Sequence, residues 1–346
     1  MSSVTIKEVA KKANVSFSTV SRVIRNAKNV HPETRKKVLR AIKKLNYYVD
    51  AGARGMVKRE TKTIGVCISD ISNPFYPPIV RGIENTINKF HYNLLLSNTD
   101  EDAEKEEVYL KLMLEKRVDG LIIAPTGQST SYLKEFIKRN IPVVFVDRKI
   151  ESISADTVST DNFQGAFSAV EHLIKLGHKR IAMIAGPRAI TTIQDRIKGY
   201  LEALKIYNIK RADSLIGEGS PTIEGGIKAT KTLFKLSSPP TAIFSCNNLM
   251  TMGALIALKR LGKNIPKDVA VVGFDDLEWA EVLDPPLTVI SQPTYTIGTT
   301  AAQLLMQRLL GEGPIKKQNI ILKPELIIRR SCGFSDKEVK KQLVDA

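Results

Sequence analysis

The sequence predicts a small all-helical unit at the N-terminus, followed by an α/β core of two doubly wound lobes. Between Thr5 and Leu45, apolar side chains recur at helical spacing. From Thr63 onward, short apolar runs typical of buried parallel strands alternate with longer helical stretches. This alternation restarts at Arg180, which predicts a second lobe similar to the first.

The first helix is expected to begin after Thr5 and to end at Asn14. Thr5, with Glu8 three residues later, is a capping-box start. Asn14 tolerates the left-handed conformation of a C-terminal cap. The inward face is predicted to be Ile6, Val9, Ala10 and Ala13.

Two further short helices are expected. Ser16 can cap the second helix, and Pro32 suits the first turn of the third. Their predicted inward residues are Val20, Val23 and Ile24, then Val38, Leu39, Ile42 and Leu45. Two short helices joined by a tight turn and closed by a third form a helix-turn-helix, whose second helix lies in the DNA major groove.

The outward side chains of the second helix suit base recognition. Arg22 can fork onto guanine, Ser18 and Ser21 can bond bases or phosphates, and Phe17 can touch a thymine methyl. The alternative is an ordinary three-helix bundle in which Arg22 is merely solvated.

Most of the positive charge lies in this N-terminal part. Residues 1–60 hold 15 Lys and Arg against 4 Asp and Glu, whereas the remainder holds 37 against 32. Such an excess favours a polyanionic partner. A membrane surface is disfavoured, because no strongly apolar amphipathic face accompanies the charge.

Neither export nor membrane insertion is expected. No apolar run approaches the roughly 20 residues that span a bilayer, and the N-terminus lacks a signal-peptide core. Cys67, Cys246 and Cys332 are too few and too far apart for a disulfide framework or a metal cluster. The protein is therefore expected in the cytoplasm, without a membrane partner, metal or cofactor.

Strands and helices of the core follow in order along the chain. The first lobe is expected to use TIGVCI, YNLLLS, DGLIIA and PVVFVD as strands, with helices over Pro78–Phe90, Glu104–Lys116 and Ser131–Asn140. The second is expected to use RIAMIAG, DSLIGEG, TAIFSC and DVAVVGFD, with helices over Ile193–Tyr207, Thr222–Leu236 and Leu249–Leu261.

Polar groups follow several of these strands. Ligands of open α/β sheets bind beyond the carboxyl ends of strands, which nominates DISNPFY, Arg148, Asn247 and Phe274–Asp276. Acidic acceptors, amides, guanidinium donors and an aromatic ring suit a sugar. A hydroxylated ligand needs several hydrogen bonds at once, because each unpaired buried polar group costs about 1–3 kcal/mol.

The segment VTIKEVAKKANVSFSTVSRVIRN, continued by VHPETRKKVLRAIKKLNY, resembles the N-terminal signature of the LacI/GalR family of bacterial transcription regulators. The likeness extends through Gly333 and implies a DNA-binding domain over 1–48. It also implies a type I periplasmic-binding-protein-like core over 62–333, whose discontinuous lobes exchange chain near 161, 292 and 323. The implied function is a repressor that binds pseudopalindromic double-stranded operator DNA as a homodimer, under control of a sugar or sugar acid. The expected DNA-contacting residues are Thr5, Ser16, Phe17, Ser18, Thr19, Ser21, Arg22, Asn29 and His31, with Ala53 and Met56 beyond them.

Residues 49–61 are implied to form a hinge that inserts Met56 into the minor groove. Residues 49–50 are Val-Asp where the family usually has Pro-Asn, and Gly52 and Gly55 each cost roughly 1 kcal/mol in a helix. A hinge helix that orders only on the operator is therefore expected, with a plain flexible linker as the alternative.

The final residues, 334–346, carry one short apolar turn and no run of heptads. We therefore expect a dimer formed by the sensor lobes, and no tetramer formed by a C-terminal coiled coil.

The family's effector site falls, position by position, on Asn73, Phe75, Asp147, Arg148, Arg196, Asn247, Asp275 and Gln292. Trp279, the only tryptophan, is expected separately to stack on a sugar ring or to form a cleft wall. Plainer alternatives are core packing for the aromatic residues, strand-end capping for Asp147 and a surface charge for Arg196. Two arginines against two aspartates, with Asn248 where the family usually has Asp, favour a sugar acid such as a keto-deoxy hexonate. The opposing possibility is that Arg148 is paired with an acid and offers the ligand no net charge.

No catalytic residues are expected. His31, His91, His172 and His178 do not pair at metal-ligand spacing, and Walker or dinucleotide-type glycine loops are missing. A sugar-processing α/β enzyme fused to a DNA-binding head is the alternative function. A secreted sugar-binding protein is a third, opposed by the basic head and the missing signal peptide.

Overall fold

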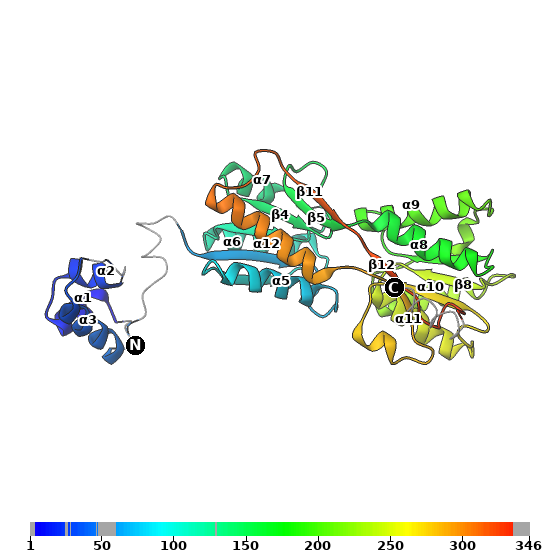
Figure 1. Ribbon diagram of the computed structural model, residues 1–346, viewed down its shortest axis with the longest axis horizontal. Helices are drawn as coiled ribbons and strands as arrows, with labels where there is room; N and C mark the ends of the chain where they lie inside the picture. The colour runs from blue at the N-terminus through cyan, green and yellow to red at the C-terminus, as the bar shows by residue number, and fades with distance from the viewer. Residues whose placement is uncertain are drawn as a thin grey trace, which may run out of the picture. The chain divides into compact units, whose positions relative to one another are not determined.

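The computed structural model describes residues 4–24, 27, 29–45, 47, 60–128 and 130–334, and the chain forms two compact units, Met1–Thr61 and Lys62–Ala346 (Figure 1). The predicted hinge positions from 49 to 59, including Ala53 and Met56, and the tail from 335 onward lie outside the described residues.

The first unit contains the three predicted helices, α1 (Ile6–Ala13), α2 (Phe17–Ile24) and α3 (Pro32–Lys44). The capping box is confirmed, because the Thr5 backbone N–H donates to Glu8 Oε2 at 2.6 Å and the Glu8 N–H donates to Thr5 Oγ1 at 3.4 Å. Asn14 ends α1 in the left-handed conformation, at φ 54°.

The core of this unit lies where the three helices meet. Its fully buried centre is Val9 of α1, Val20 of α2 and Val38 of α3. The inward assignment of Leu39 was wrong, since its side chain is 51% exposed. Leu39 lies about 100° around the helix from Val38, and Ala41 completes the buried face instead.

The second unit consists of two α/β lobes. The first lobe begins with β1 (Thr63–Ile68), α5 (Tyr76–Asn88), β2 (Asn93–Asn98), α6 (Ala103–Glu115), β3 (Gly120–Ile123), α7 (Ser131–Lys138), β4 (Val143–Val146) and β5 (Asp156–Thr160). The second lobe contains α8 (Asn162–Lys175), β6 (Ile181–Ala185), α9 (Thr191–Ile206), η1 (Asp213–Leu215), β7 (Ile216–Glu218), α10 (Ile223–Leu233), β8 (Ala242–Ser245), α11 (Asn248–Arg260), β9 (Ala270–Phe274), η2 (Glu278–Glu281) and β10 (Thr288–Ser291). The chain then adds α12 (Thr294–Leu310) and β11 (Asn319–Leu322) to the first lobe, and β12 (Glu325–Ile327) to the second.

Each lobe contains a twisted, mainly parallel sheet. The strand orders are β11-β5-β4-β3-β1-β2 and β12-β10-β9-β8-β6-β7, in which only β12 runs antiparallel to its neighbour among the pairs described. The chain passes between the lobes after β5, after β10 and after β11, which places Asp161 and Gln292 in connecting segments.

Helices cover both faces of the first sheet. Helices α5 and α12 bury Ile79, Ile83 and Leu305 on one face, whereas α6 and α7 bury Met113 and Phe136 on the other. Helices α5 and α12 lie side by side (Figure 1). They approach so closely that a Cβ on Gly298 would stand 2.0 Å from the Ile79 carbonyl oxygen.

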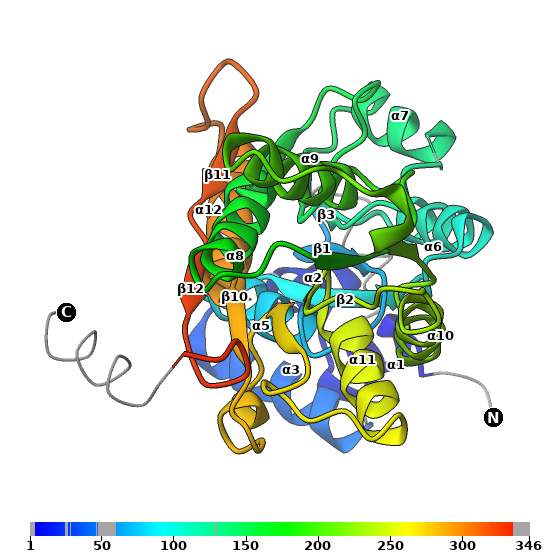
Figure 2. The same cartoon turned by 90° about the vertical axis from the view of Figure 1, so that its right-hand side faces the viewer.

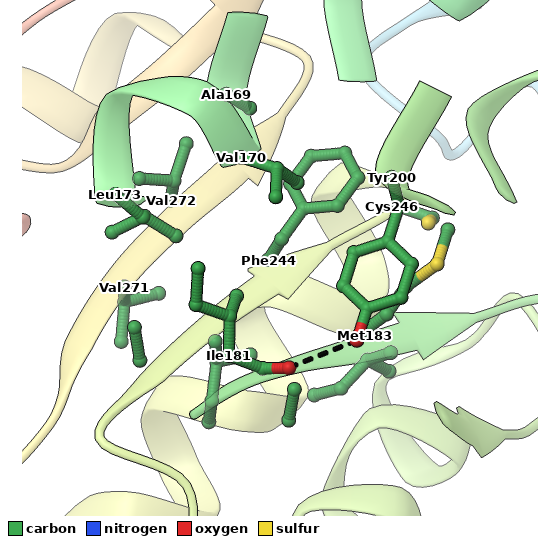
Figure 3. Close-up of a cluster of buried hydrophobic side chains, with 14 of the residues drawn as sticks. Ala169, Val170, Leu173, Ile181, Met183, Tyr200, Phe244, Cys246, Val271 and Val272 are labelled. Carbon is green, nitrogen blue, oxygen red and sulfur yellow. Dashed lines mark hydrogen bonds between the residues drawn. The ribbon is translucent and has the colours of Figure 1, made fainter. Parts of the chain in front are cut away.

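The second lobe has the same layered arrangement, with α8 and α9 on one side of its sheet and α10 and α11 on the other (Figure 2). Tyr200 of α9 is buried against this sheet and donates its hydroxyl proton to the Ile181 carbonyl at 3.0 Å (Figure 3). Among the described residues, no helix combines the length and apolarity that crossing a bilayer requires.

Candidate functional site

The exposed side of α2 carries three of the side chains predicted to contact DNA. Phe17 is 54% exposed, and Ser18 and Arg22 are also exposed. Ser16 caps the helix, because its Oγ accepts the Thr19 backbone N–H at 3.2 Å. The short helix α2 therefore presents hydroxyl groups and an aromatic ring at its start and a guanidinium in its last turn.

The remaining predicted contacts of this unit lie around that helix. Ser21 is half-buried, whereas Thr5, Asn29 and His31 are exposed. Thr5 is engaged in the α1 capping box, and His31 precedes α3 without forming a side-chain cap.

In the second unit, a cavity of about 470 Å³ lies between the lobes. It is lined by Asp70, Ser72, Asn73, Phe75, Tyr76, Asp100, Glu101, Asp147, Arg148, Ile190, Thr192, Ile193, Arg196, Ser220, Pro221, Thr222, Asn247, Leu249, Asp275 and Gln292. Eight of the nine residues predicted to bind an effector are therefore brought together. The exception is Trp279, which is half-buried in η2 and does not line the cavity.

Asp147 and Asp275 occupy equivalent positions in the two lobes. Each follows a buried strand directly, and each has a positive φ, 66° and 75°, which turns the side chain away from the strand direction. Their backbone N–H groups still donate to the neighbouring strands, at 3.0 Å to Val158 and at 2.8 Å to Ile290. Burial raises the pKa of both carboxyl groups, against the opposing effect of nearby arginines.

Arg148 is already paired within the protein. Its Nη1 and Nη2 donate to the two carboxylate oxygens of Glu101, at 2.8 and 2.6 Å. Nη2 also donates to Ser69 Oγ at 2.9 Å and Tyr76 Oη at 3.0 Å, while Nε lies 3.5 Å from Asp147 Oδ2.

This pairing weakens the charge argument for a sugar acid, because it engages one of the two arginines on which that argument depended. Five carboxylates, those of Asp70, Asp100, Glu101, Asp147 and Asp275, line the cavity, against the guanidinium groups of Arg148 and Arg196. Of these acids, Asp100 is ion-paired with Lys105 and Glu101 with Arg148. The sequence prediction counted only two of these acids. The opposing possibility, an Arg148 neutralised by an acid, is the one observed, and the acid is Glu101.

Arg196 is held rigidly at the other side of the cavity. Its Nε donates to Asn162 Oδ1 at 2.8 Å, its Nη1 donates to the Cys246 carbonyl, and its guanidinium stacks 3.7 Å from the centre of the Phe274 ring. Only 4% of the residue is exposed, so the surface-charge alternative is excluded.

Asp275 and Gln292 form a buried pair. Gln292 Nε2 donates to Asp275 Oδ1 at 2.6 Å, and the Asn248 backbone N–H approaches Asp275 Oδ2 at 3.4 Å. Gln292 Oε1 is buried without a hydrogen-bond partner in the described structure. Such an orphaned acceptor in a polar cavity is suited to a hydroxyl donor from a ligand.

One side-chain hydrogen bond joins the two lobes across the cavity. Asn248 Nδ2, at the start of α11, donates to Asn73 Oδ1 at 2.8 Å. The same Asn73 oxygen accepts the Phe75 backbone N–H at 3.0 Å, which fixes its orientation. Asn247 is the N-cap of α11, because its Oδ1 accepts the Met250 N–H at 2.7 Å.

Sequence reasoning missed several lining residues, above all Asp100 and Glu101, whereas Tyr76 belongs to the nominated segment DISNPFY. Asp100 and Glu101 follow β2 closely, so the strand-end rule could have found them had it been applied to that strand. No group of three or more His, Cys, Asp and Glu side chains able to hold a metal ion occurs among the described residues.

Known proteins match both units. Residues 5–50 match the bacterial regulatory proteins of the lacI family, and residues 61–324 match the periplasmic binding proteins and sugar binding domain of the LacI family. Catabolite control protein A of Priestia megaterium is 39% identical over 308 residues, covering 87% of this chain and 91% of the relative. The ribose operon repressor of Haemophilus influenzae is 35% identical over 327 residues, covering 94% of this chain and 98% of the relative.

Among solved structures, the lac repressor dimer bound to operator and the anti-inducer ONPF superimposes with a TM-score of 0.82 at 29% identity, covering 96% of this chain and 99% of that one. These proteins are regulators, and they give no support to the alternative of an enzyme fused to a DNA-binding head. The chain therefore belongs to the LacI family, as a DNA-binding transcriptional regulator with the family's sugar-binding core.

Proposed function

We propose that this protein represses transcription from a pseudopalindromic operator and that a neutral sugar bound in the cavity between the lobes controls its DNA affinity. Residues 1–48 would bind DNA, 49–61 would serve as the hinge and 62–333 would form the sensor. The protein would act in the cytoplasm, where bacterial DNA lies.

The pairing of Arg148 with Glu101 carries the choice of a neutral ligand. With that guanidinium neutralised, a ligand carboxylate would enter a cavity dominated by acids. A polyol has no charge to be repelled, and its hydroxyl protons suit the carboxylates of Asp147 and Asp275.

The remaining lining side chains support the same class. Gln292 Oε1 is an unpaired acceptor, Arg196 is a rigidly held donor, and the Phe75 ring offers an apolar surface against which the C–H face of a sugar can pack. The cavity volume of about 470 Å³ lies within the range of small-molecule sites. The likeness to a ribose operon repressor further supports a sugar.

Assembly follows from the operator requirement. One helix-turn-helix contacts too few bases for tight specific binding, so two copies related by a twofold axis would bind two half-sites. The lac repressor, to which this chain is similar, is described as a dimer bound to operator. The ligand would weaken DNA binding only as far as it prefers the lobe arrangement that disfavours the operator.

Calorimetry with D-ribose, D-glucose, D-gluconate, D-glucuronate and adenosine tests the sensor. We expect a neutral sugar to bind and Asp275→Asn to weaken its binding about 10- to 100-fold, since hydrogen bonds to a charged group contribute about 1.5–3 kcal/mol. Asp213→Asn is the control, because Asp213 is exposed in the same lobe and does not line the cavity.

Tight binding of a sugar acid by the wild type, with no neutral sugar bound, would contradict the proposed ligand class while leaving a sensor in place. Equal affinities of wild type and Asp275→Asn for the bound sugar would contradict the site itself.

A further inference from the structure

The corner between β2 and α6 holds an acid against the cavity. Asp100 and Glu101 both have positive φ, 54° and 59°, a conformation that is unfavourable for residues other than glycine. Two consecutive residues in this region require support from their surroundings.

The corner has that support. The Asp100 backbone N–H donates to the Ser69 carbonyl at 2.6 Å, which ties the corner to the end of β1. Asn98 donates from Nδ2 to Asp100 Oδ1 at 2.5 Å, and its Oδ1 accepts the Ile71 N–H at 2.6 Å. On the other side, Asp102 caps α6 through the N–H groups of the first turn.

The corner holds the Glu101 carboxylate against the two terminal nitrogens of the buried Arg148 guanidinium, a position that we call the Arg148 fork. Glu101 contacts both terminal nitrogens of Arg148, at 2.6 and 2.8 Å, although 47 residues separate the two in sequence. The Arg148 side chain is 6% exposed, whereas that of Glu101 is 33% exposed. A parallel two-point contact of this kind is the geometry that a ligand carboxylate would also use.

We infer that Glu101 is a specificity-determining residue, which excludes sugar carboxylates by occupying the Arg148 fork with the protein's own carboxylate. This inference rests on the proposed sensor function of the cavity. It deepens that proposal, because it assigns the choice between neutral and acidic ligands to one side chain.

The Glu101 side chain and a sugar acid would both contact Arg148 through a carboxylate. A sugar acid could bind Arg148 only by displacing Glu101, which would leave a second carboxylate beside the first and close to Asp147. A neutral sugar needs no such displacement. Removing the Glu101 charge should therefore create affinity for acids rather than merely reduce affinity for neutral sugars.

The experiment compares Glu101→Gln with wild type in calorimetry, using the matched pairs D-glucose with D-glucuronate and D-ribose with D-ribonate. We expect at least about a tenfold gain in affinity for one of the acids, from a hydrogen-bonded charge contact of about 1.5 kcal/mol or more. Glu101→Gln removes the charge, whereas Glu101→Ser also removes the side-chain atoms that contact Arg148, and it should show a gain in the same direction.

Two controls separate the effect from a general change of charge or stability. Glu104→Gln makes the same charge change on an exposed side chain of α6 outside the cavity, and it should gain nothing. Glu101→Gln combined with Arg148→Met should lose the gain, because the acid would have no fork to bind. A purely structural role for Glu101 would change the unfolding midpoint without producing this pattern.

The inference is overturned if both Glu101 variants fold and neither gains affinity for an acid, or if wild type already binds an acid as tightly as its neutral partner. Failure of wild type to bind either neutral sugar would count against the proposed ligand class. A gain of acid binding by Glu101→Gln would still support the exclusion in that case.

Discussion

At the scale of single residues, burial decides how the acids of the first lobe behave. Glu106 of α6 is fully buried and accepts the Thr126 backbone N–H at 2.7 Å and the Thr126 hydroxyl at 3.2 Å. Burial raises the pKa of the Glu106 carboxyl to about 7, because both hydrogen bonds only partly compensate for the loss of water. Its ordinary value is near 4.5, so the folded protein retains a proton that the unfolded chain releases.

This difference makes stability depend on pH. Below about 4.5 both states are protonated, and between 4.5 and 7 only the folded state holds the proton, so the free energy of unfolding falls as pH rises through that window. Above about 7 the folded protein bears the full cost of a buried carboxylate.

Glu106→Gln should remove that dependence, since an amide keeps the acceptor for Thr126 without a charge. We expect the variant to gain roughly 1–3 kcal/mol in free energy of unfolding at pH 8 relative to wild type, and little at pH 4.5. Urea unfolding of the full chain at both pH values measures the difference, with Glu104→Gln as the exposed control. An equal effect at both pH values would contradict the titration of Glu106.

At the scale of elements, local signals in the sequence predicted most of the helices. The capping box at Thr5, the proline of α3 and the long amphipathic stretches act within a few residues, so no tertiary information is needed. Strand β5 was not predicted separately, because its sequence DTVST has no apolar run and it is a strand only through its partners β4 and β11.

The cavity residues also divide into those that local sequence signals predict and those that depend on tertiary structure. Asn73, Arg148, Asn247 and Asp275 follow strands that the sequence indicates clearly, so the strand-end rule located them. The strand-end rule could also nominate Glu101 as a lining residue, but it could not predict that Glu101 pairs with Arg148. That pairing depends on the sheet order β4-β3-β1-β2, in which Arg148 after β4 contacts Glu101 after β2 past the ends of β3 and β1.

The proposal that α2 contacts base edges can be tested with a single substitution. Arg22 is exposed near the end of α2, and a forked contact with guanine would discriminate one base pair by about 1–3 kcal/mol. Arg22→Ala should therefore lose preference at one operator position, whereas Lys36→Ala, exposed on α3, should at most weaken all sequences alike.

Fluorescence anisotropy with operator variants, at a stated salt concentration, measures both effects. An unchanged base preference in Arg22→Ala would contradict the assignment of α2 as the helix that contacts base edges.

At the scale of the whole sensor, the two lobes are coupled by covalent connections and by side chains across the cavity. The chain passes between them after β5, β10 and β11. Each of these three connections starts from a strand at one edge of a sheet, the edge formed by β11 and β5 in the first lobe and by β12 and β10 in the second. Away from those connections, the Asn248–Asn73 hydrogen bond joins α11 to the loop after β1. A ligand that binds both lobes favours the arrangement in which the lobes are joined, as this hydrogen bond does.

Asn248→Ala should therefore weaken the response to effector without altering the head. Because Asn248 is 2% exposed and its bond is worth about 0.5–1.5 kcal/mol, removing it should raise the sugar concentration that half-releases operator by about 2- to 10-fold. Sugar and operator DNA affect each other's affinity reciprocally. Without sugar, operator affinity should therefore change only as far as the lobe arrangement joined by the Asn248–Asn73 bond disfavours DNA. Asn85→Ala is the matched control, because its amide donates to Tyr295 Oη at 3.2 Å between α5 and α12 of one lobe. Titrating sugar into the protein–operator complex measures the midpoint for each variant. A midpoint that moves equally in both variants, or in neither, would show that the bond across the cavity does not contribute to the switch.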